Sequence, residues 1–359
     1  MWPDRRLIDL FGIEHPIVLA PMAGAMDVEL AIAVAQAGGF GSLPSALLDA
    51  EKLRAQVAQF QAAAPGKPLN LNFFVHRPAV PNNAREHAWR EALKPYYAEL
   101  DIDPAAPVPA SNRAPFNDAL CEVVEEIRPR VVSFHFGLPT PALAKRVQAA
   151  GCLILGSATT VAEARWLADH GCDVVIAQGF EAGGHRGHFL SDNLAAQPGT
   201  FALVPQVVDA VKVPVIAAGG ISDARGIVAA LALGAAAVQI GSAYLHCPES
   251  KILPPHRAAL KSASDDGTVV TNLMTGRPAR GIVNRVMREL GPVSPLAPEF
   301  PLAGGALAPL NAKAQAQGSG DFSSMWAGQA AGLGRALPAR ELTRKLADEA
   351  QALMQRMAG

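Results

Sequence analysis

The feature that most constrains this chain is an alternation of short apolar runs with longer segments of helical period through its first 245 residues. This alternation predicts parallel strands joined by crossover helices. Eight strands are expected, at 17–20, 40–43, 69–74, 131–134, 153–157, 174–177, 215–218 and 237–240. Helices are expected between them at 28–37, 49–63, 141–150, 161–170, 203–211 and 223–233.

The expected strands are almost continuously apolar, which suits a sheet buried on both faces. With eight βα repeats, this favours a closed (β/α)8 TIM barrel, although a doubly wound open sheet would give a similar alternation. We assign residues 1–74 and 117–245 to the barrel. Residues 75–116 form a proline-rich insertion after strand 3 that is expected to be a lid or substrate wall, and 246–359 form a C-terminal extension packing on the barrel.

Composition removes several functional classes. The formal net charge is −1, and no dense Lys/Arg run marks a nucleic-acid or membrane surface. The first 14 residues carry charges where a signal peptide would be apolar, and the apolar stretch 227–240 is too short to span a bilayer, so a cytoplasmic protein is expected. The four cysteines show no metal-ligand spacing; we expect buried thiols and no metal site: Cys121, Cys152, Cys172, Cys247.

Two consecutive glycine corners are the strongest chemical signal. The strand at 215–218 ends in Gly219-Gly220, and the strand at 237–240, which contains Gln239 and Ile240, ends in Gly241-Ser242. Glycine lets backbone N–H groups approach a phosphate closely, and the helix beginning near Asp223 adds a favourable dipole. In (β/α)8 barrels the loops after strands 7 and 8 form such a phosphate site.

A glycine-rich loop follows the sixth expected strand and reads Gln178-Gly-Phe-Glu-Ala-Gly-Gly-His-Arg-Gly187. With the segment 16–22 (PIVLAPM), the strand 69–74 (LNLNFF) and the tail 318–332 (GSGDFSSMWAGQAAG), it resembles the class I nitronate monooxygenases over nearly the whole chain. The resemblance implies non-covalently bound FMN. It also implies that O2 oxidises a small anionic nitronate to a carbonyl compound and nitrite or nitrate. Propionate 3-nitronate is the substrate that the resemblance suggests.

The resemblance and the chemistry of the side chains together suggest roles. Backbone at Ala20, Pro21 and Met22 would lie against the flavin ring, and the amides of Asn70 and Gln178 would meet its heteroatoms. Asn72 lies on the same strand face as Asn70, and we choose Asn70. The remaining expected cofactor contacts are Gly183 at the ribityl chain and Gly219, Gly220, Gln239, Ile240, Gly241 and Ser242 at the phosphate corners.

His185 is the expected catalytic residue, because its imidazole could bind a nitronate as donor or cation, or act as general base toward a neutral nitroalkane. Several neighbours are weaker candidates. Glu181 could be an acid or base but is more readily a helix cap or a partner of Arg186. The others are the histidines His76, His135 and His188, the adjacent Tyr96 and Tyr97 of the insertion, and Trp326 of the tail.

Three other functions stay open. A flavin-dependent enoyl-acyl-carrier-protein reductase using NADH shares the Ala-Pro-Met start and the Gly-Gly-His loop. An inosine monophosphate dehydrogenase-like enzyme would need a nucleophilic cysteine that loop 178–199 lacks. A regulator that binds flavin without turnover is the third. A homodimer is a further expectation, with no nucleic-acid or membrane partner.

Overall fold

The computed structural model describes residues 2–105, 107–108 and 113–359, so part of the predicted insertion 75–116 lies outside the described residues. One sheet contains eight parallel strands, and their bounds match the expected ones to within a residue or so. They are β1 (Ile17–Leu19), β2 (Gly41–Pro44), β3 (Leu69–Phe74), β4 (Val131–His135), β5 (Leu153–Ala158), β6 (Val174–Gln178), β8 (Val215–Ala218) and β9 (Ala237–Ile240).

The sheet closes on itself. Its order is β1-β9-β8-β6-β5-β4-β3-β2. The two end strands meet through a parallel bridge between Val18 and Phe40. Two hydrogen bonds hold this junction, from Leu19 N to Phe40 O at 3.0 Å and from Phe40 N to Ile17 O at 2.8 Å. The predicted (β/α)8 barrel is therefore confirmed, and the doubly wound alternative is wrong.

Helices pack around the barrel, and side-chain caps fix where most of them begin. Asp49 accepts a hydrogen bond from Lys52 N, and Asn117 accepts one from Leu120 N, each satisfying an end amide that has no partner within the helix. The barrel helices are α2 (Val28–Gln36), α3 (Ala50–Ala63), α5 (Asp118–Ile127), α6 (Pro141–Ala149), α7 (Val161–Asp169), α8 (Thr200–Ala210) and α9 (Ala224–Ala232), with α1 (Arg6–Phe11) before β1. Their buried apolar side chains join the strands in one large core. All four cysteines are buried and free.

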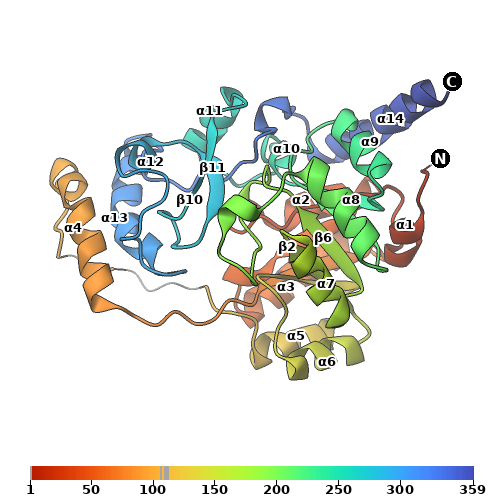
Figure 1. The fold of residues 1–359 in the computed structure, drawn as a ribbon, viewed down its shortest axis with the longest axis horizontal. Coiled ribbons are helices and arrows are strands. Elements are labelled where there is room, and N and C mark those ends of the chain that lie inside the picture. Colours follow the sequence, from red (N-terminus) through yellow and green to blue (C-terminus); the bar gives the residue numbers. More distant parts are fainter. Residues whose placement is uncertain (1, 106, 109–112) are drawn as a thin grey trace.

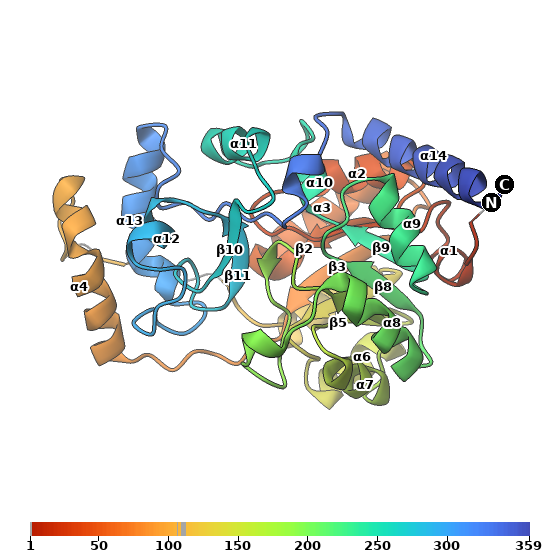
Figure 2. The same cartoon turned by 45° about the horizontal axis from the view of Figure 1, so that its top comes forward.

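A second region lies beside the barrel and is built from the insertion and the extension (Figures 1 and 2). Helix α4 (Asn83–Glu99) of the insertion packs against α13 (Ala303–Ala316) of the extension. Trp89 donates to Ala303 O at 3.0 Å, and Tyr97 donates to Ala306 O at 2.5 Å. The other elements of this region are α11 (Pro254–Lys261), α12 (Arg285–Glu289) and a small antiparallel sheet of β10 (Thr268–Thr271), β11 (Ala279–Ile282) and β7 (Gly184–His185). No local pattern in the sequence predicts this sheet.

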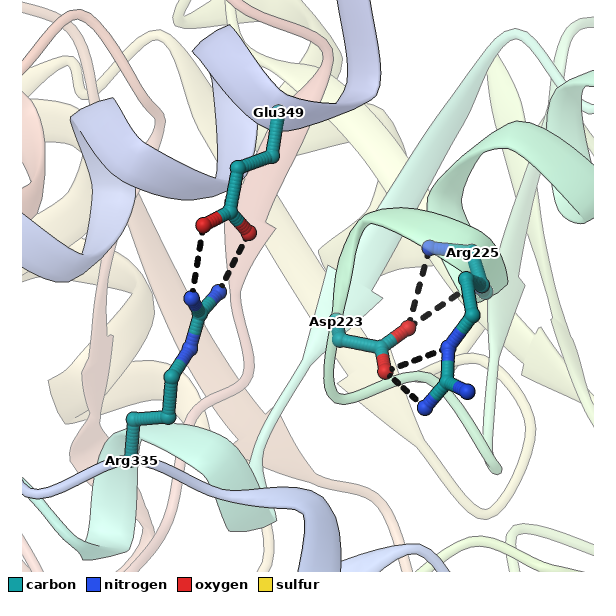
Figure 3. A network of polar contacts seen from close by, with 5 residues as sticks. Asp223, Arg225, Arg335 and Glu349 are labelled. Carbon is teal, nitrogen blue, oxygen red and sulfur yellow. Dashed lines mark hydrogen bonds and ion pairs between the residues drawn. The ribbon is translucent and has the colours of Figure 1, made fainter. Parts of the chain in front are cut away.

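The chain returns to the barrel at its C-terminal end, where α14 (Ala339–Ala358) packs on α2 and α9. Arg335, just before α14, forms a bidentate pair with Glu349 at 2.7 and 2.8 Å. On neighbouring α9, Asp223 accepts from the N–H groups of Arg225 and Gly226 and also pairs with the Arg225 guanidinium (Figure 3). Among the described residues, no helix is both long and apolar enough to cross a membrane.

Candidate active site

A cavity opens at the carboxyl ends of the barrel strands, where (β/α)8 barrels carry their active sites. Short turns after β1, β8 and β9, the loop after β6 and the tail segment around residue 326 all line it. All but two of the expected site residues line this cavity: Ala20, Pro21, Met22, Gln178, Gly183, His185, Gly219, Gly220, Gln239, Gly241 and Ser242. The two that do not are Asn70 and Ile240, which are buried in the barrel.

The glycine corners form one end of the cavity. Gly219 and Gly220 have φ values of +109° and +71°, a region that disfavours side chains. A Cβ on Gly219 would lie 3.0 Å from the backbone nitrogen of Ala182. Within the described chain, no recorded hydrogen bond uses the N–H groups of Gly219, Gly220 or Gly241. The first amides of α9 bond to Asp223 instead, so the N–H groups left for a ligand are those of the corners and not those of the helix end.

Asn70 and Asn72 of β3 lie at different depths in the barrel. Asn70 donates to Ser42 Oγ at 3.0 Å within the core, and its Oδ1 is buried without a partner. Asn72, two residues nearer the strand's carboxyl end, lines the cavity and donates to Ser133 Oγ at 2.9 Å. Both side chains are on the face expected from the two-residue period, but Asn72 is the one placed to meet a ligand.

Gln178 organises the loop that follows β6. Its Nε2 donates to His185 O at 3.0 Å, and its Oε1 accepts from Gly187 N at 2.8 Å. Glu181 does not line the cavity. Its carboxylate accepts from Thr200 N at 2.8 Å and Thr200 Oγ1 at 2.9 Å, and so caps α8. It is the expected helix cap, although Arg186 is not its hydrogen-bonding partner.

Two buried arginines brace the same loop. Arg186 donates to the carbonyl oxygens of Gly179 and Gln178 at 2.7 and 3.0 Å. Arg280 of β11 donates to Phe180 O at 3.1 Å. Both guanidinium groups lie near the Phe180 ring, 5.4 and 5.0 Å from its centre, a cation–π arrangement. The loop is therefore held to the extension as well as to the barrel.

His185 lies in β7, where it pairs with Ala279 of β11. Its Nε2 is 3.0 Å from Thr275 Oγ1, and its carbonyl oxygen is also 3.1 Å from His135 Nε2. The imidazole is enclosed by aromatic rings whose centres lie 5.3 to 5.9 Å away: Phe74, Phe136, Phe300 and Trp326. The imidazole is therefore packed among aromatic side chains, and its contact with Thr275 limits how the ring can turn.

The surroundings of His185 keep it neutral. Burial holds its pKa well below the usual range, and the positive charges of Arg113 and Arg277 and the neighbouring His135 and His76 lower it further. Arg113 lines the cavity, and Arg277 is stacked over Phe136 at 4.1 Å. Of the roles expected for His185, this environment favours a neutral donor or base over a cation.

The weaker candidates fall into two groups. Trp326 and His135 line the cavity, and burial lowers the pKa of His135 to about 3. Tyr96 and Tyr97 are instead buried in the second region, where Tyr97 donates to Ala306 O of α13 and the Tyr96 ring lies edge-on to Phe322. His76 and His188 are buried beside the site, and His188 lies 3.5 Å from Asp192.

Sequence reasoning missed Arg113, Thr275 and Arg277. Arg113 belongs to the insertion that was expected to form a substrate wall, so its position carried a weak signal. Thr275 lies 90 residues after His185. It joins the site only because β11 pairs with β7, and no local motif announces that pairing.

The residues of the cavity fit a phosphorylated flavin. The glycine corners form a cradle that side chains would fill, and Asn72 and Gln239 place amides further along the same cavity. Met22 and Trp326 provide flat or adaptable apolar surface for an aromatic ring system. Among the lining residues, all within the described chain, there is no carboxylate to repel an anion.

Comparison with known proteins identifies the family. The nitronate monooxygenase family model matches residues 4–349. The nitronate monooxygenase of Pseudomonas aeruginosa is 43% identical over 96% of this chain and 98% of its own length. The nitroalkane oxidase structure from Streptomyces ansochromogenes superposes with a TM-score of 0.88 at 36% identity, covering 98% of this chain and 99% of that one. FabK from Thermotoga maritima gives a TM-score of 0.75 at 29% identity, covering 100% and 99%. The chain therefore belongs to the nitronate monooxygenase family, a flavin-dependent family of oxidoreductases.

Proposed function

We propose that this protein is an FMN-dependent enzyme that oxidises a small anionic nitronate with O2 to a carbonyl compound, releasing nitrite or nitrate. The observation that carries the proposal is one cavity with a glycine-lined anion cradle at one end and His185 at the other. Propionate 3-nitronate is the substrate we would test first. Its negative charges suit a cavity with a cation, Arg113, and no carboxylate among the described lining residues.

FMN would be held by residues already described. The N–H groups at Gly219, Gly220 and Gly241 would bind its phosphate, Gly183 would face the ribityl chain, and Asn72 would meet the ring. Ala20, Pro21 and Met22 would lie against the ring plane. When bound, FMN supplies the two-electron redox chemistry between the substrate and O2.

The protein's own part is to bind, orient and keep water away. Arg113 would attract the anionic substrate, and the aromatic residues around His185 would exclude water from the reacting carbon. A nitronate arrives already deprotonated, so neutral His185 would orient it. A neutral nitroalkane still carries its carbon-bound proton, which His185 would accept as general base.

The second candidate function, enoyl reduction with NADH, rests on the similarity to FabK, which is weaker in both identity and TM-score than that to the nitroalkane oxidase. A dehydrogenase of the inosine monophosphate type would need a thiol in the cavity. Among the described lining residues there is no cysteine.

The test is spectroscopic. Purified protein is expected to be yellow, and anaerobic addition of propionate 3-nitronate should bleach the oxidised flavin within the turnover time. NADH under the same conditions is the control and should leave the spectrum unchanged. Bleaching by NADH alone would favour the reductase, and a colourless protein that does not take up FMN would refute both.

A further inference from the structure

The inference concerns Thr275, a residue of the extension that does not line the cavity. Thr275 is 1% exposed and lies in the turn between β10 and β11. Its hydroxyl oxygen is 3.0 Å from His185 Nε2. Among the hydrogen bonds of the described residues, this contact with Thr275 is the one that the imidazole of His185 makes.

A neutral imidazole carries one N–H and one lone pair, so the partner of one nitrogen decides what the other can do. The aromatic neighbours do not make that choice: the three phenylalanine rings have no N–H or O–H, and among the hydrogen bonds of the described residues the indole N–H of Trp326 forms none with the imidazole. The charged and titratable groups around it, Arg113, Arg277, His135 and His76, all disfavour the imidazolium. The orientation of the Thr275 hydroxyl therefore determines the tautomer.

Three contacts of Thr275 Oγ1 fix that orientation. Besides His185 Nε2, it lies 3.3 Å from Arg277 O and 3.5 Å from Arg277 N. A carbonyl oxygen can only accept, and a backbone N–H can only donate. The hydroxyl has a single proton. All three contacts are satisfied together only if that proton is donated to Arg277 O, and Oγ1 then accepts from Arg277 N and from His185 Nε2–H.

We propose that Thr275 is a positioning residue that holds the proton of neutral His185 on Nε2, leaving the lone pair on Nδ1 as the proton acceptor. With a neutral nitroalkane, the substrate's C–H bond breaks, its electron pair stays on the substrate as a nitronate, and the proton forms a bond to Nδ1. The resulting imidazolium keeps its Nε2–H bond to Thr275. This step rests on the proposed function, whereas the tautomer itself does not.

The backbone supports the same arrangement. The pairing of His185 with Ala279 in β11 and of Gly184 with Arg280 fixes the distance between the imidazole and the turn that carries Thr275. The carbonyl oxygen of His185 is held from the opposite side by Gln178 and His135. The extension thus orients both the main chain and the side chain of the barrel's expected catalytic residue.

The direct test is ¹⁵N NMR of the FMN-loaded protein labelled at histidine, with the His185 signals identified from their loss in His185→Asn. We expect a protonated Nε2 and an unprotonated Nδ1 in the wild type and in Thr275→Ser, which keeps the hydroxyl. Thr275→Val has nearly the same shape without the hydroxyl and should show a mixture of tautomers. A wild-type spectrum with the proton on Nδ1 would overturn the proposal, even if the valine variant did not fold.

Kinetics provide a second, independent measurement. Thr275→Val should lower kcat/KM for a neutral nitroalkane such as nitroethane by about tenfold, and that for the preformed nitronate by less than about threefold. Thr275→Ser should stay close to wild type with both substrates, and FMN absorbance should be the same in all three proteins. Equal losses on both substrates would refute the role of Thr275 in proton transfer. Wild-type protein inactive toward both would instead refute the proposed function, while the NMR result would stand.

Discussion

The two ends of the cavity are built in different ways. The cradle end consists of short turns that directly follow β8 and β9, and its key residues fall within a window of about 30 positions in the sequence. The His185 end is assembled from the loop after β6, the insertion, the turn before β11 and the tail. Its parts meet only after the extension has folded against the barrel.

This difference separates binding from chemistry. The cradle uses backbone N–H groups that almost any sequence could offer, provided glycine is present at the corners. The His185 end uses particular side chains, whose pKa values and orientation depend on neighbours from distant segments. Substitutions at the two ends should therefore have separable effects on FMN affinity and on turnover. Three of the four predictions below test that separation, and the second tests the burial of the histidines around His185.

The largest expected effect is at His185. Replacing it with asparagine should lower turnover of a neutral nitroalkane such as nitroethane by roughly 10²–10⁴-fold, since a positioned acid–base group contributes about that much. Turnover of the preformed nitronate, which His185 only orients, should fall by less. FMN content, read from the absorbance ratio of purified protein, should not change. His87→Asn, an exposed histidine on α4, is the matched control. Full activity in His185→Asn would remove it from the mechanism, and loss of FMN would show that the two ends are not separable.

The second prediction is that acid lowers the free energy of unfolding. Burial lowers the pKa of His76 and of His188 to about 4. The unfolded chain takes up protons below pH 6.5 that the folded protein does not, so stability present above pH 6.5 is lost as the pH falls toward 4. Between pH 6.5 and 5 each of these histidines should cost about 2 kcal/mol of unfolding free energy, measured in urea.

His188→Gln should reduce the loss of unfolding free energy between pH 6.5 and 5 by the contribution of one histidine, about 2 kcal/mol, because the amide does not titrate. A wild-type unfolding free energy that stays constant from pH 7 to 5 would contradict the prediction.

The third prediction concerns the cradle. Gly219→Ala should weaken FMN binding about tenfold, because a residue with a Cβ is strained at φ +109° and would crowd Ala182. Gly151→Ala is the matched control: its φ is +81°, but no atom lies within 4 Å of the added Cβ. Titration of apoprotein with FMN measures both. If the two variants bound FMN equally well, the corner would not be the phosphate site.

The smallest effect distinguishes the two amides on β3. Asn72→Ala should weaken FMN binding about fivefold through one lost hydrogen bond. Asn70→Ala should alter stability but not FMN affinity, because Asn70 bonds to Ser42 within the barrel. The opposite outcome would restore the choice made from the sequence, and the same FMN titration decides between them.

The sequence predicted what local patterns determine. The barrel strands and the glycine corners were expected at or within a residue or so of their observed positions, because apolar runs and Gly-Gly turns act over a few residues. Asn70 and Asn72 were correctly placed on one face, but the two-residue period carries no information on depth along the barrel axis. Only the structure shows that Asn72, and not Asn70, lines the cavity.

The site residues that escaped prediction are all brought in over long sequence distances. Thr275 reaches His185 through the pairing of β7 with β11, and β7 is only two residues long. No periodicity exists in a segment that short. Tyr96 and Tyr97 show the reverse case. Their place in a predicted substrate wall suggested a function, but Tyr97 is buried against α13 and Tyr96 against Phe322.

The tail segment that runs over the cavity has one more consequence. Gly328 N donates to Ser242 Oγ at 2.8 Å, Gln329 N donates to Glu181 O at 3.0 Å, and Trp326 forms a bridge with Gly281. The ribosome makes this segment after every strand of the barrel. A nascent chain that stops near residue 320 has both glycine corners but lacks the tail segment that lines the cavity beside them, so the pocket is completed only after residue 330 has been made.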